Sequence, residues 1–249
     1  MGHRNNRQHV DIASLTAETQ GFSPPRLLAW AAERFARQVA FATSLGVEDQ
    51  ALTDMIARAA PSIAVFTIDT GRLHPQTLEL VRTTRQRCGL EIQVLCPDPE
   101  EVAQMVREHG ADLFYSSIDN RRLCCHVRKV NVLRRRLAGL GAWVCGLRRE
   151  QSVTREAVQT IGWDQANGLV KINPLADWTI AQVWDYVRDH DVPYNPLHDE
   201  GYPSIGCQPC TRAVEPGQDI RSGRWWWESP EHKECGLHVV DGRLVRKTR

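Results

Sequence analysis

Short apolar runs alternate along the chain with longer segments in which apolar residues recur at helical spacing. The runs are rich in Val, Ile, Phe and Ala and predict buried strands over 39–43, 63–68, 91–96, 143–147 and 170–173. The periodic segments predict helices that end near 60 and others over 74–88, 99–109, 124–140 and 179–189. Because helices separate successive strands, we predict βαβ crossovers, and thus an α/β fold whose parallel sheet carries helices on both faces.

The two ends of the chain lack this alternation. Residues 1–22 are polar and predict a flexible N-terminal arm, and a first helix should start at Ser23 and the two prolines that follow. Beyond residue 190, frequent prolines prevent long helices and predict a loop layer laid over the sheet rim. We expect one α/β domain over 23–228 and a mobile C-terminal segment over 229–249.

Composition narrows the class of protein. The 249 residues carry a formal net charge of +1, which argues against a nucleic-acid partner. Apolar runs are too short to span a membrane, and the N-terminus has no apolar core typical of a signal peptide. We therefore expect a cytoplasmic protein, in which eight cysteines indicate metal binding or catalysis rather than disulfides. Composition does not determine the oligomeric state, and a homo-oligomer is one possibility.

Four of the cysteines form two pairs. Cys124 and Cys125 are adjacent, and Cys207 and Cys210 form a CxxC in a stretch rich in Pro and Gly. Together they supply four sulfur ligands, the number that zinc or an iron–sulfur cube requires. Basic residues, Lys129 among them, crowd the first pair and would stabilise an anionic four-thiolate centre. The alternative is two buried cysteines beside an unrelated CxxC.

Two loops follow predicted strands, where an α/β sheet binds its ligands. Ser44 and Gly46 open a loop before a helix, where backbone N–H groups favour an anion. Asp69, Thr70 and Gly71 follow the second strand and would form the floor of a nucleoside pocket. Both loops have a plainer interpretation, as helix-capping or Asx-type turns.

Arginines and one further cysteine complete the candidate set. Arg148 and Arg155 lie in the polar exit of the fourth strand, and Arg221 and Arg224 precede a Trp-Trp-Trp-Glu segment. Such arginines either are solvated or bind ribose and phosphate oxygens. Cys235 stands among Lys and His residues that favour its thiolate, which makes it a candidate nucleophile. A fifth metal ligand or an inert thiol is the alternative.

Taken together, these motifs resemble the assimilatory adenylylsulfate (adenosine 5′-phosphosulfate) reductases, in the iron–sulfur branch of the APS/PAPS reductase family. The resemblance covers residues 39–238, and its most specific parts are the two cysteine pairs, Arg-Trp-Trp-Trp-Glu over 224–228 and Glu-Cys-Gly-Leu-His over 234–238. It implies an adenine-nucleotide α-hydrolase fold of the PP-loop type. ATP-using members carry Ser-Gly-Gly-x-Asp-Ser in the first loop, whereas this chain has Ser-Leu-Gly-Val-Glu-Asp over 44–49, which suits a sulfonucleotide.

The resemblance also implies roles for single residues. The four paired cysteines would hold a [4Fe–4S] cluster, and Cys235 would be the catalytic nucleophile. Lys129 matches the family lysine between cluster and substrate, and three further residues match its phosphosulfate-binding positions: Arg221, Arg224 and His238. The 3′-phosphorylated branch lacks the cluster cysteines, so the full set favours adenosine 5′-phosphosulfate as substrate.

The activity so implied belongs to sulfate assimilation for cysteine biosynthesis. The Cys235 thiolate would attack the activated sulfur and expel AMP, leaving an S-sulfocysteine. Thioredoxin or a similar dithiol donor would then release sulfite. Three alternatives remain: a 3′-phosphoadenosine 5′-phosphosulfate reductase, an ATP-using enzyme of the same fold, and a non-catalytic module with a structural zinc.

Overall fold

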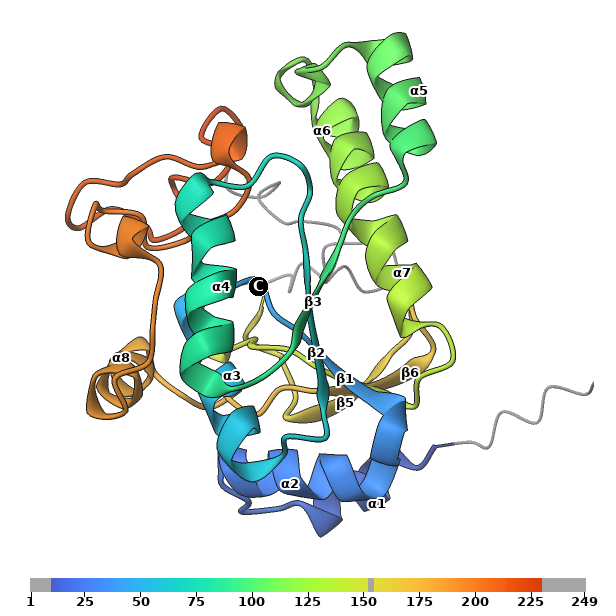
Figure 1. Cartoon of the computed structure of the whole chain (residues 1–249), viewed down its shortest axis with the longest axis vertical. Coiled ribbons are helices and arrows are strands. Elements are labelled where there is room, and N and C mark those ends of the chain that lie inside the picture. Colours follow the sequence, from blue (N-terminus) through green and yellow to red (C-terminus); the bar gives the residue numbers. More distant parts are fainter. Residues whose placement is uncertain (1–9, 152–154, 230–249) are drawn as a thin grey trace, which may run out of the picture.

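A six-stranded sheet organises the computed structural model, which describes residues 10–151 and 155–229 (Figure 1). Its strands run in the order β3-β2-β1-β4-β6-β5 across the sheet. Their bounds are β1 Val39–Ala42, β2 Ala64–Ile68, β3 Ile92–Leu95, β4 Ala142–Val144, β5 Ile161–Asp164 and β6 Leu169–Ile172. All neighbours pair in parallel except β5, which is antiparallel to β6. The predicted α/β sheet is confirmed, with an antiparallel edge strand added to it.

The helices begin where local sequence favours a helix start. Proline occupies the first turn of α2, α4 and α5, where its missing N–H costs no hydrogen bond. Thr179 and Gln182 form a reciprocal capping box at the start of α8. The bounds are α1 Ile12–Glu18, α2 Pro24–Phe35, α3 Val47–Ala59, α4 Pro75–Cys88, α5 Pro99–His109, α6 Ile118–Cys125, α7 Asn131–Leu137 and α8 Ile180–Asp189.

Both faces of the sheet are covered, because successive strand residues point to opposite sides. Val39 and Phe41 of β1 pack into the larger core, together with apolar residues of α2, α3 and α8. Ala40, between them, packs into a second core with Leu133 and Leu137 of α7. Figure 1 shows α7 on one side of the strands and α2 and α3 on the other. The sheet is therefore a buried middle layer, as the near-continuous apolar runs predict.

Three local predictions differ from the structure. Within the expected flexible arm, α1 forms instead, because Asp11 caps it and Leu15 is buried. The helix expected over 124–140 begins earlier, at Ile118, and is interrupted by a π-helical turn, η3, over His126–Val130. Strand β5 lies in a segment for which no strand was predicted. The domain boundaries at 22/23 and 228/229 stay predictions.

The segment after α8 is irregular, as its prolines predict. Its helical elements within residues 190–229 are the short 3₁₀ turns η6 over Pro196–His198 and η7 over Gln208–Cys210. An isolated bridge pairs Leu73 with Cys207, which brings this layer back onto the loop after β2. Among the described residues, none of the helices is long and apolar enough to cross a membrane.

Candidate active site

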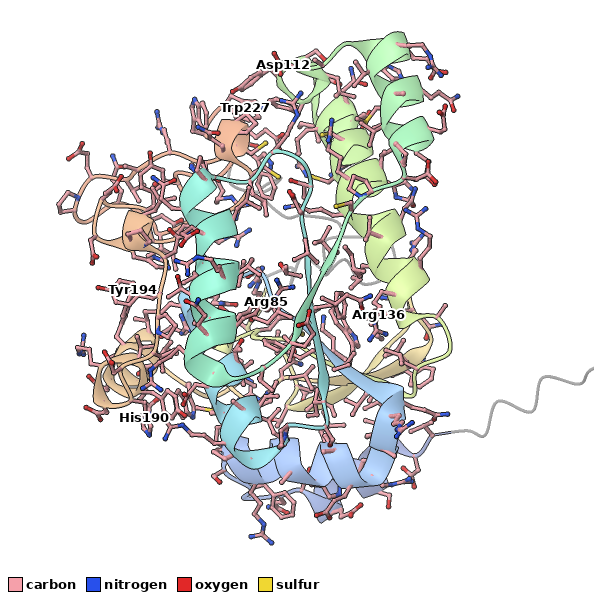
Figure 2. All side chains as sticks on the ribbon, in the orientation of Figure 1. Arg85, Asp112, Arg136, His190, Tyr194 and Trp227 are labelled. Atoms are coloured by element: carbon pink, nitrogen blue, oxygen red, sulfur yellow. The ribbon has the colours of Figure 1, made fainter. Side chains whose placement is uncertain are left out.

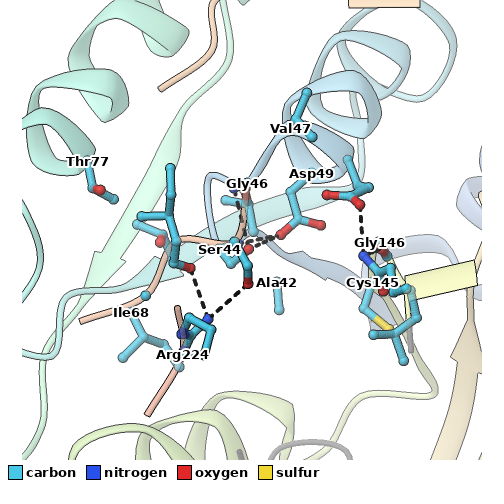
Figure 3. Close-up of a pocket in the computed structure, with 18 of the residues that line it drawn as sticks. Ala42, Ser44, Gly46, Val47, Asp49, Ile68, Thr77, Cys145, Gly146 and Arg224 are labelled. Atoms are coloured by element: carbon cyan, nitrogen blue, oxygen red, sulfur yellow. Dashed lines mark hydrogen bonds between the residues drawn. The ribbon is translucent and has the colours of Figure 1, made fainter. Parts of the chain in front are cut away.

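A cavity of about 240 Å³ lies at the carboxyl ends of β1, β2 and β4 (Figure 3). The chain winds from β1 toward β2 in one direction and continues from β4 toward β6 in the other, so the cavity lies where the strand order reverses. Open α/β sheets bind their ligands at this place. Of the predicted substrate-binding residues, the described ones that line it are Ser44, Gly46, Lys129, Arg155, Arg221 and Arg224.

The first loop is held together by its own side chains. Asp49 accepts hydrogen bonds from both the backbone N–H and the hydroxyl of Ser44, each at 2.6 Å. The Leu45 N–H donates to the Thr43 hydroxyl at 3.0 Å, and the Gly46 N–H donates to the Ser44 hydroxyl at 3.4 Å. Acceptors within the loop therefore occupy the N–H groups of residues 44–46, which belong to the predicted anion site. Two acidic residues also fill the first turn of α3, where the helix dipole favours negative charge.

Asp49 is fully buried, and burial raises the pKa of its carboxyl group to about 6 despite the hydrogen bonds from Ser44. The folded protein thus holds a proton that the unfolded chain releases near pH 3.8, so folding stability should fall as pH rises from about 4 to 6. We expect Asp49→Asn to gain stability relative to the wild type across this window, by on the order of 3 kcal/mol at most. Chemical unfolding at pH 4 and pH 7 measures this gain. An equal difference at both pH values contradicts it.

Arg148 lies outside the set of residues that line the cavity. Its buried guanidinium donates to the Glu48 carboxylate at 3.0 and 2.9 Å and forms an ion pair with Glu150 at 3.0 Å. Gln151 donates to the same Glu48 oxygen at 2.9 Å and accepts a hydrogen bond from Arg155. Arg148 therefore holds the first loop, while Arg155 reaches the cavity.

Arg224 lies in another part of the cavity than the Asp49 carboxylate. In Figure 3, Arg224 and Asp49 lie on separate sides of Ser44. The Arg224 guanidinium lies 3.4 Å from the Ser204 hydroxyl and 3.3 Å from the Ile205 carbonyl, and a side chain at Gly206 would collide with it. The absence of a side chain at this glycine therefore leaves room for the arginine.

The loop after β2 faces the cysteines rather than the cavity. The Asp69 carboxylate accepts a hydrogen bond from the Gly71 N–H at 2.8 Å, an Asx-type turn. The Thr70 hydroxyl lies 3.2 Å from the Cys207 sulfur, and its carbonyl accepts from Arg128 at 2.7 Å. None of Asp69, Thr70 and Gly71 is among the residues that line the first cavity.

The four paired cysteines line one small second cavity. They come from the end of α6 and from the loop around η7, and cations surround them: Arg72, Arg121, Arg128 and Lys129. A satellite apolar core of residues such as Met105, Phe114 and Trp225 encloses the pairs. Within the described residues, no group of three or more His, Cys, Asp or Glu side chains is arranged to hold a single metal ion.

Burial and the neighbouring cations shift the pKa values of three of these thiols in different directions. Burial raises the pKa of Cys210 to about 12 and also raises the pKa of Cys124. Burial opposes ionisation of Cys207 as well, yet the Lys129 ammonium and the Thr70 hydroxyl outweigh it and lower the pKa of that thiol. Lys129 lines both cavities and is the residue that joins them.

The sequence of the chain matches the Phosphoadenosine phosphosulfate reductase domain over residues 38–213. It is 56% identical to an adenosine 5′-phosphosulfate reductase of Allochromatium vinosum, across 80% of this chain and 78% of that protein. It is 53% identical to a protein of the same name from Burkholderia cepacia, across 86% of this chain and 85% of that protein. The chain belongs to the adenosine 5′-phosphosulfate reductase family. That family consists of oxidoreductases.

Solved structures agree with this family. A phosphoadenylyl-sulfate reductase from Candida auris, in a phosphate complex, superposes with a TM-score of 0.69 at 31% identity, across 82% of this chain and 96% of that one. An FMN adenylyltransferase from Candida glabrata superposes with a TM-score of 0.52 at 13% identity, across 96% of this chain and 83% of that one. The second likeness concerns the fold alone. It confirms the PP-loop type of sheet that the sequence predicts for this reductase family.

Two candidate residues of this family member, Cys235 and His238, lie outside the described residues, so their roles stay predictions. Sequence reasoning missed several residues that line the cavity, among them Gln151, His198 and Ser204. Gln151 stands within the polar exit of β4, and that exit was the available signal for it. His198 and Ser204 lie in the proline-rich layer, where no periodic pattern points to a site.

Proposed function

We propose that this chain reduces adenosine 5′-phosphosulfate to sulfite and AMP, with electrons from thioredoxin or a similar dithiol protein. The observation that carries the proposal is the position of Lys129, which lines both the cavity at the sheet rim and the cavity of the four cysteines. The names of the relatives support the same substrate. A cytoplasmic location, where dithiol proteins stay reduced, is part of the proposal.

In the proposed reaction the Cys235 thiolate attacks the sulfate sulfur. A sulfur–sulfur bond forms, the bond between sulfur and the phosphate oxygen breaks, and AMP leaves with that electron pair. The donor dithiol then attacks the Cys235 sulfur, sulfite leaves with the bonding electrons, and the second donor thiol restores the Cys235 thiol. The donor ends as a disulfide, so it supplies both electrons.

The described cations prepare the cavity for this step. Lys129, Arg221 and Arg224 line it and would neutralise the phosphosulfate, so that an anionic thiolate can approach the sulfur. The first loop brings the carboxylates of Glu48 and Asp49 to the cavity, and Arg148 neutralises the first of them. A ribose hydroxyl can donate a hydrogen bond to a carboxylate, which an ionised 3′-phosphate cannot do. These acceptors support the substrate without a 3′-phosphate.

The four cysteines fit a [4Fe–4S] cluster, which is part of the proposal. Cys124, Cys125, Cys207 and Cys210 line one cavity and so bring together the four thiolates that such a cube requires. The surrounding guanidinium and ammonium groups would stabilise the negative charge of a four-thiolate centre. When bound, the cluster would supply a fixed charge and a covalent tie between two segments.

We expect Lys129→Ala to lower kcat/KM by about 100-fold or more and to change folding stability far less, because the ammonium group lines both cavities and would neutralise the bound phosphosulfate. Steady-state kinetics with adenosine 5′-phosphosulfate and thermal unfolding provide the comparison. Lys171→Ala is the matched control, since Lys171 lies on β6 and not in the cavity. Unchanged kinetics in Lys129→Ala would remove this lysine from the proposed site.

Sulfite release from the two sulfonucleotides, with a thioredoxin system present, tests the proposed substrate. We expect turnover of adenosine 5′-phosphosulfate to exceed that of the 3′-phosphorylated compound by at least about tenfold, a free-energy difference of about 1.4 kcal/mol. Comparable or faster turnover of the 3′-phosphorylated compound contradicts the proposed substrate. Sulfite release from neither compound contradicts the proposed activity.

A further inference from the structure

A buried ion pair fastens the last described segment to the helix that carries the tandem cysteines. The Arg121 guanidinium donates to both carboxylate oxygens of Glu228, at 2.9 and 2.7 Å. The two side chains are 0% and 2% exposed. Arg121 lies on α6, three positions before Cys124. A fully buried charge pair of this kind needs a role, because apolar side chains of the same volume would be as stable or more so.

Arg121 also contacts the cysteine site. Its side chain forms a hydrogen bond with Cys125, so one guanidinium joins a proposed cluster ligand to Glu228. Arg121 also lies on the Trp225 ring, 4.6 Å from its centroid. Arg224, which lines the substrate cavity, lies 4.7 Å from the centroid of the same ring. Trp225 is therefore buried between the arginine of the cysteine site and an arginine of the substrate cavity.

The backbone at Trp225 is strained, and aromatic contacts hold the segment around it in place. Trp225 has a positive φ of 41°, which is rare for a bulky side chain and costs conformational energy. Trp227 packs on Tyr115 with ring centroids 4.5 Å apart, and the Tyr115 hydroxyl donates to the Pro209 carbonyl at 2.9 Å. Figure 2 labels Trp227 and Asp112 in the upper part of the molecule, and the Trp227 and Phe114 ring centroids are 6.3 Å apart, so the loop before α6 meets this segment.

We propose that Arg121 is a positioning residue, whose ion pair with Glu228 makes residues 225–228 a clasp between the cysteine site, Arg224 and the segment that carries Cys235. This inference rests on the proposed function. Seven Cα–Cα steps separate Glu228 from Cys235, so chain length alone keeps the nucleophile within about 25 Å of Glu228. The clasp fixes the Glu228 end of this tether against α6. Loss of the clasp therefore slows the approach of Cys235 to its substrate.

The test compares Glu228→Gln with wild-type protein in a single turnover without a dithiol donor. We expect Glu228→Gln to add SO₃ to Cys235 at least about tenfold more slowly, while AMP affinity stays within about threefold. Asp54→Asn is the control, because Asp54 is a buried carboxylate paired with Arg58 and Tyr186, away from the cavity. Its adduct should form at the wild-type rate. Equal adduct rates in wild type and Glu228→Gln overturn the inference.

A second readout is independent of turnover. The Trp225 N–H donates to the Cys210 carbonyl at 3.1 Å, and the Glu228 N–H donates to the Trp225 carbonyl at 2.8 Å. Glu228→Gln should speed amide hydrogen exchange at these two positions, because the clasp then opens more often. If wild-type protein forms no adduct, the proposed function is wrong, and hydrogen exchange alone tests the clasp. An unchanged exchange rate then overturns the inference.

A third variant guards against a failure of Glu228→Gln to fold. The double substitution Arg121→Met with Glu228→Leu replaces the ion pair by apolar side chains, which fold as well as a buried pair in other proteins. It keeps the packing on Trp225 and removes the bond to Cys125. We expect a folded protein with the same slow adduct formation. A folded double variant with the wild-type rate overturns the inference.

Discussion

Cys235→Ser will abolish sulfite release, with a fall in kcat of about 10⁴-fold or more, while AMP still binds. Serine has nearly the size of cysteine, but its hydroxyl is too weakly acidic to supply an anionic nucleophile at neutral pH without a dedicated base. Binding survives because Lys129, Arg221 and Arg224 line the cavity and belong to a different part of the chain. Sulfite assay and calorimetric titration with AMP measure the two quantities.

The control for this variant is Cys96→Ser. Cys96 is an exposed thiol at the end of β3 and lines neither cavity, so its replacement should leave turnover unchanged. Steady sulfite production by Cys235→Ser would assign the nucleophile to another residue. Equal losses in both variants would show a general sensitivity to thiol replacement.

Cys207→Ser will lose the cluster and lower activity by about 100-fold or more, since even residues that only support a metal ligand contribute 10- to 100-fold. Cys207 comes from the loop layer, 82 positions after Cys125 in the sequence, and shares a cavity with it. A centre bound by both segments fastens the loop layer to α6, so its loss also loosens Arg224. Iron content, acid-labile sulfide and visible absorbance give the readout, and Cys124, Cys125 and Cys210 should behave alike.

Cys88→Ser is the matched control for the cluster variants, because Cys88 is a half-buried cysteine at the end of α4, outside both cavities. It should keep full iron content. A Cys207→Ser protein with full iron content would remove this residue from the ligands. A wild-type protein that is colourless and holds one zinc per chain would replace the cluster with a structural zinc.

Strong periodicity decided how much of the fold the sequence could predict. The buried parallel strands appear as apolar runs, and four of the five predicted runs differ from the observed strands only at their ends by one or two residues. Strand β5 was not predicted, because Gly162 and Asp164 interrupt its apolar pattern and it is an edge strand that pairs with β6 alone. The π-helical turn over His126–Val130 was not predicted, because hydrophobic spacing does not distinguish a single such turn from the α-helix around it.

Residue types indicated several residues of the cavity but not the direction of every side chain. Lys129, Arg155, Arg221 and Arg224 line the cavity, and their roles in substrate binding stay predictions. The direction of a side chain within a loop is set by tertiary contacts, and for this reason Thr70 was expected in the nucleoside pocket but contacts Cys207 instead. Arg148 illustrates the same limit, since only the fold brings Glu48 to its guanidinium.

The central claim is that sulfur passes through a covalent adduct on Cys235. Wild-type protein with adenosine 5′-phosphosulfate and no dithiol donor tests it most directly, by intact mass and peptide mapping. We predict one SO₃ group on Cys235, one AMP released per adduct, and loss of the adduct as sulfite when thioredoxin is added. An unmodified protein that still releases sulfite once thioredoxin is present, or a label on any other cysteine, would contradict the mechanism.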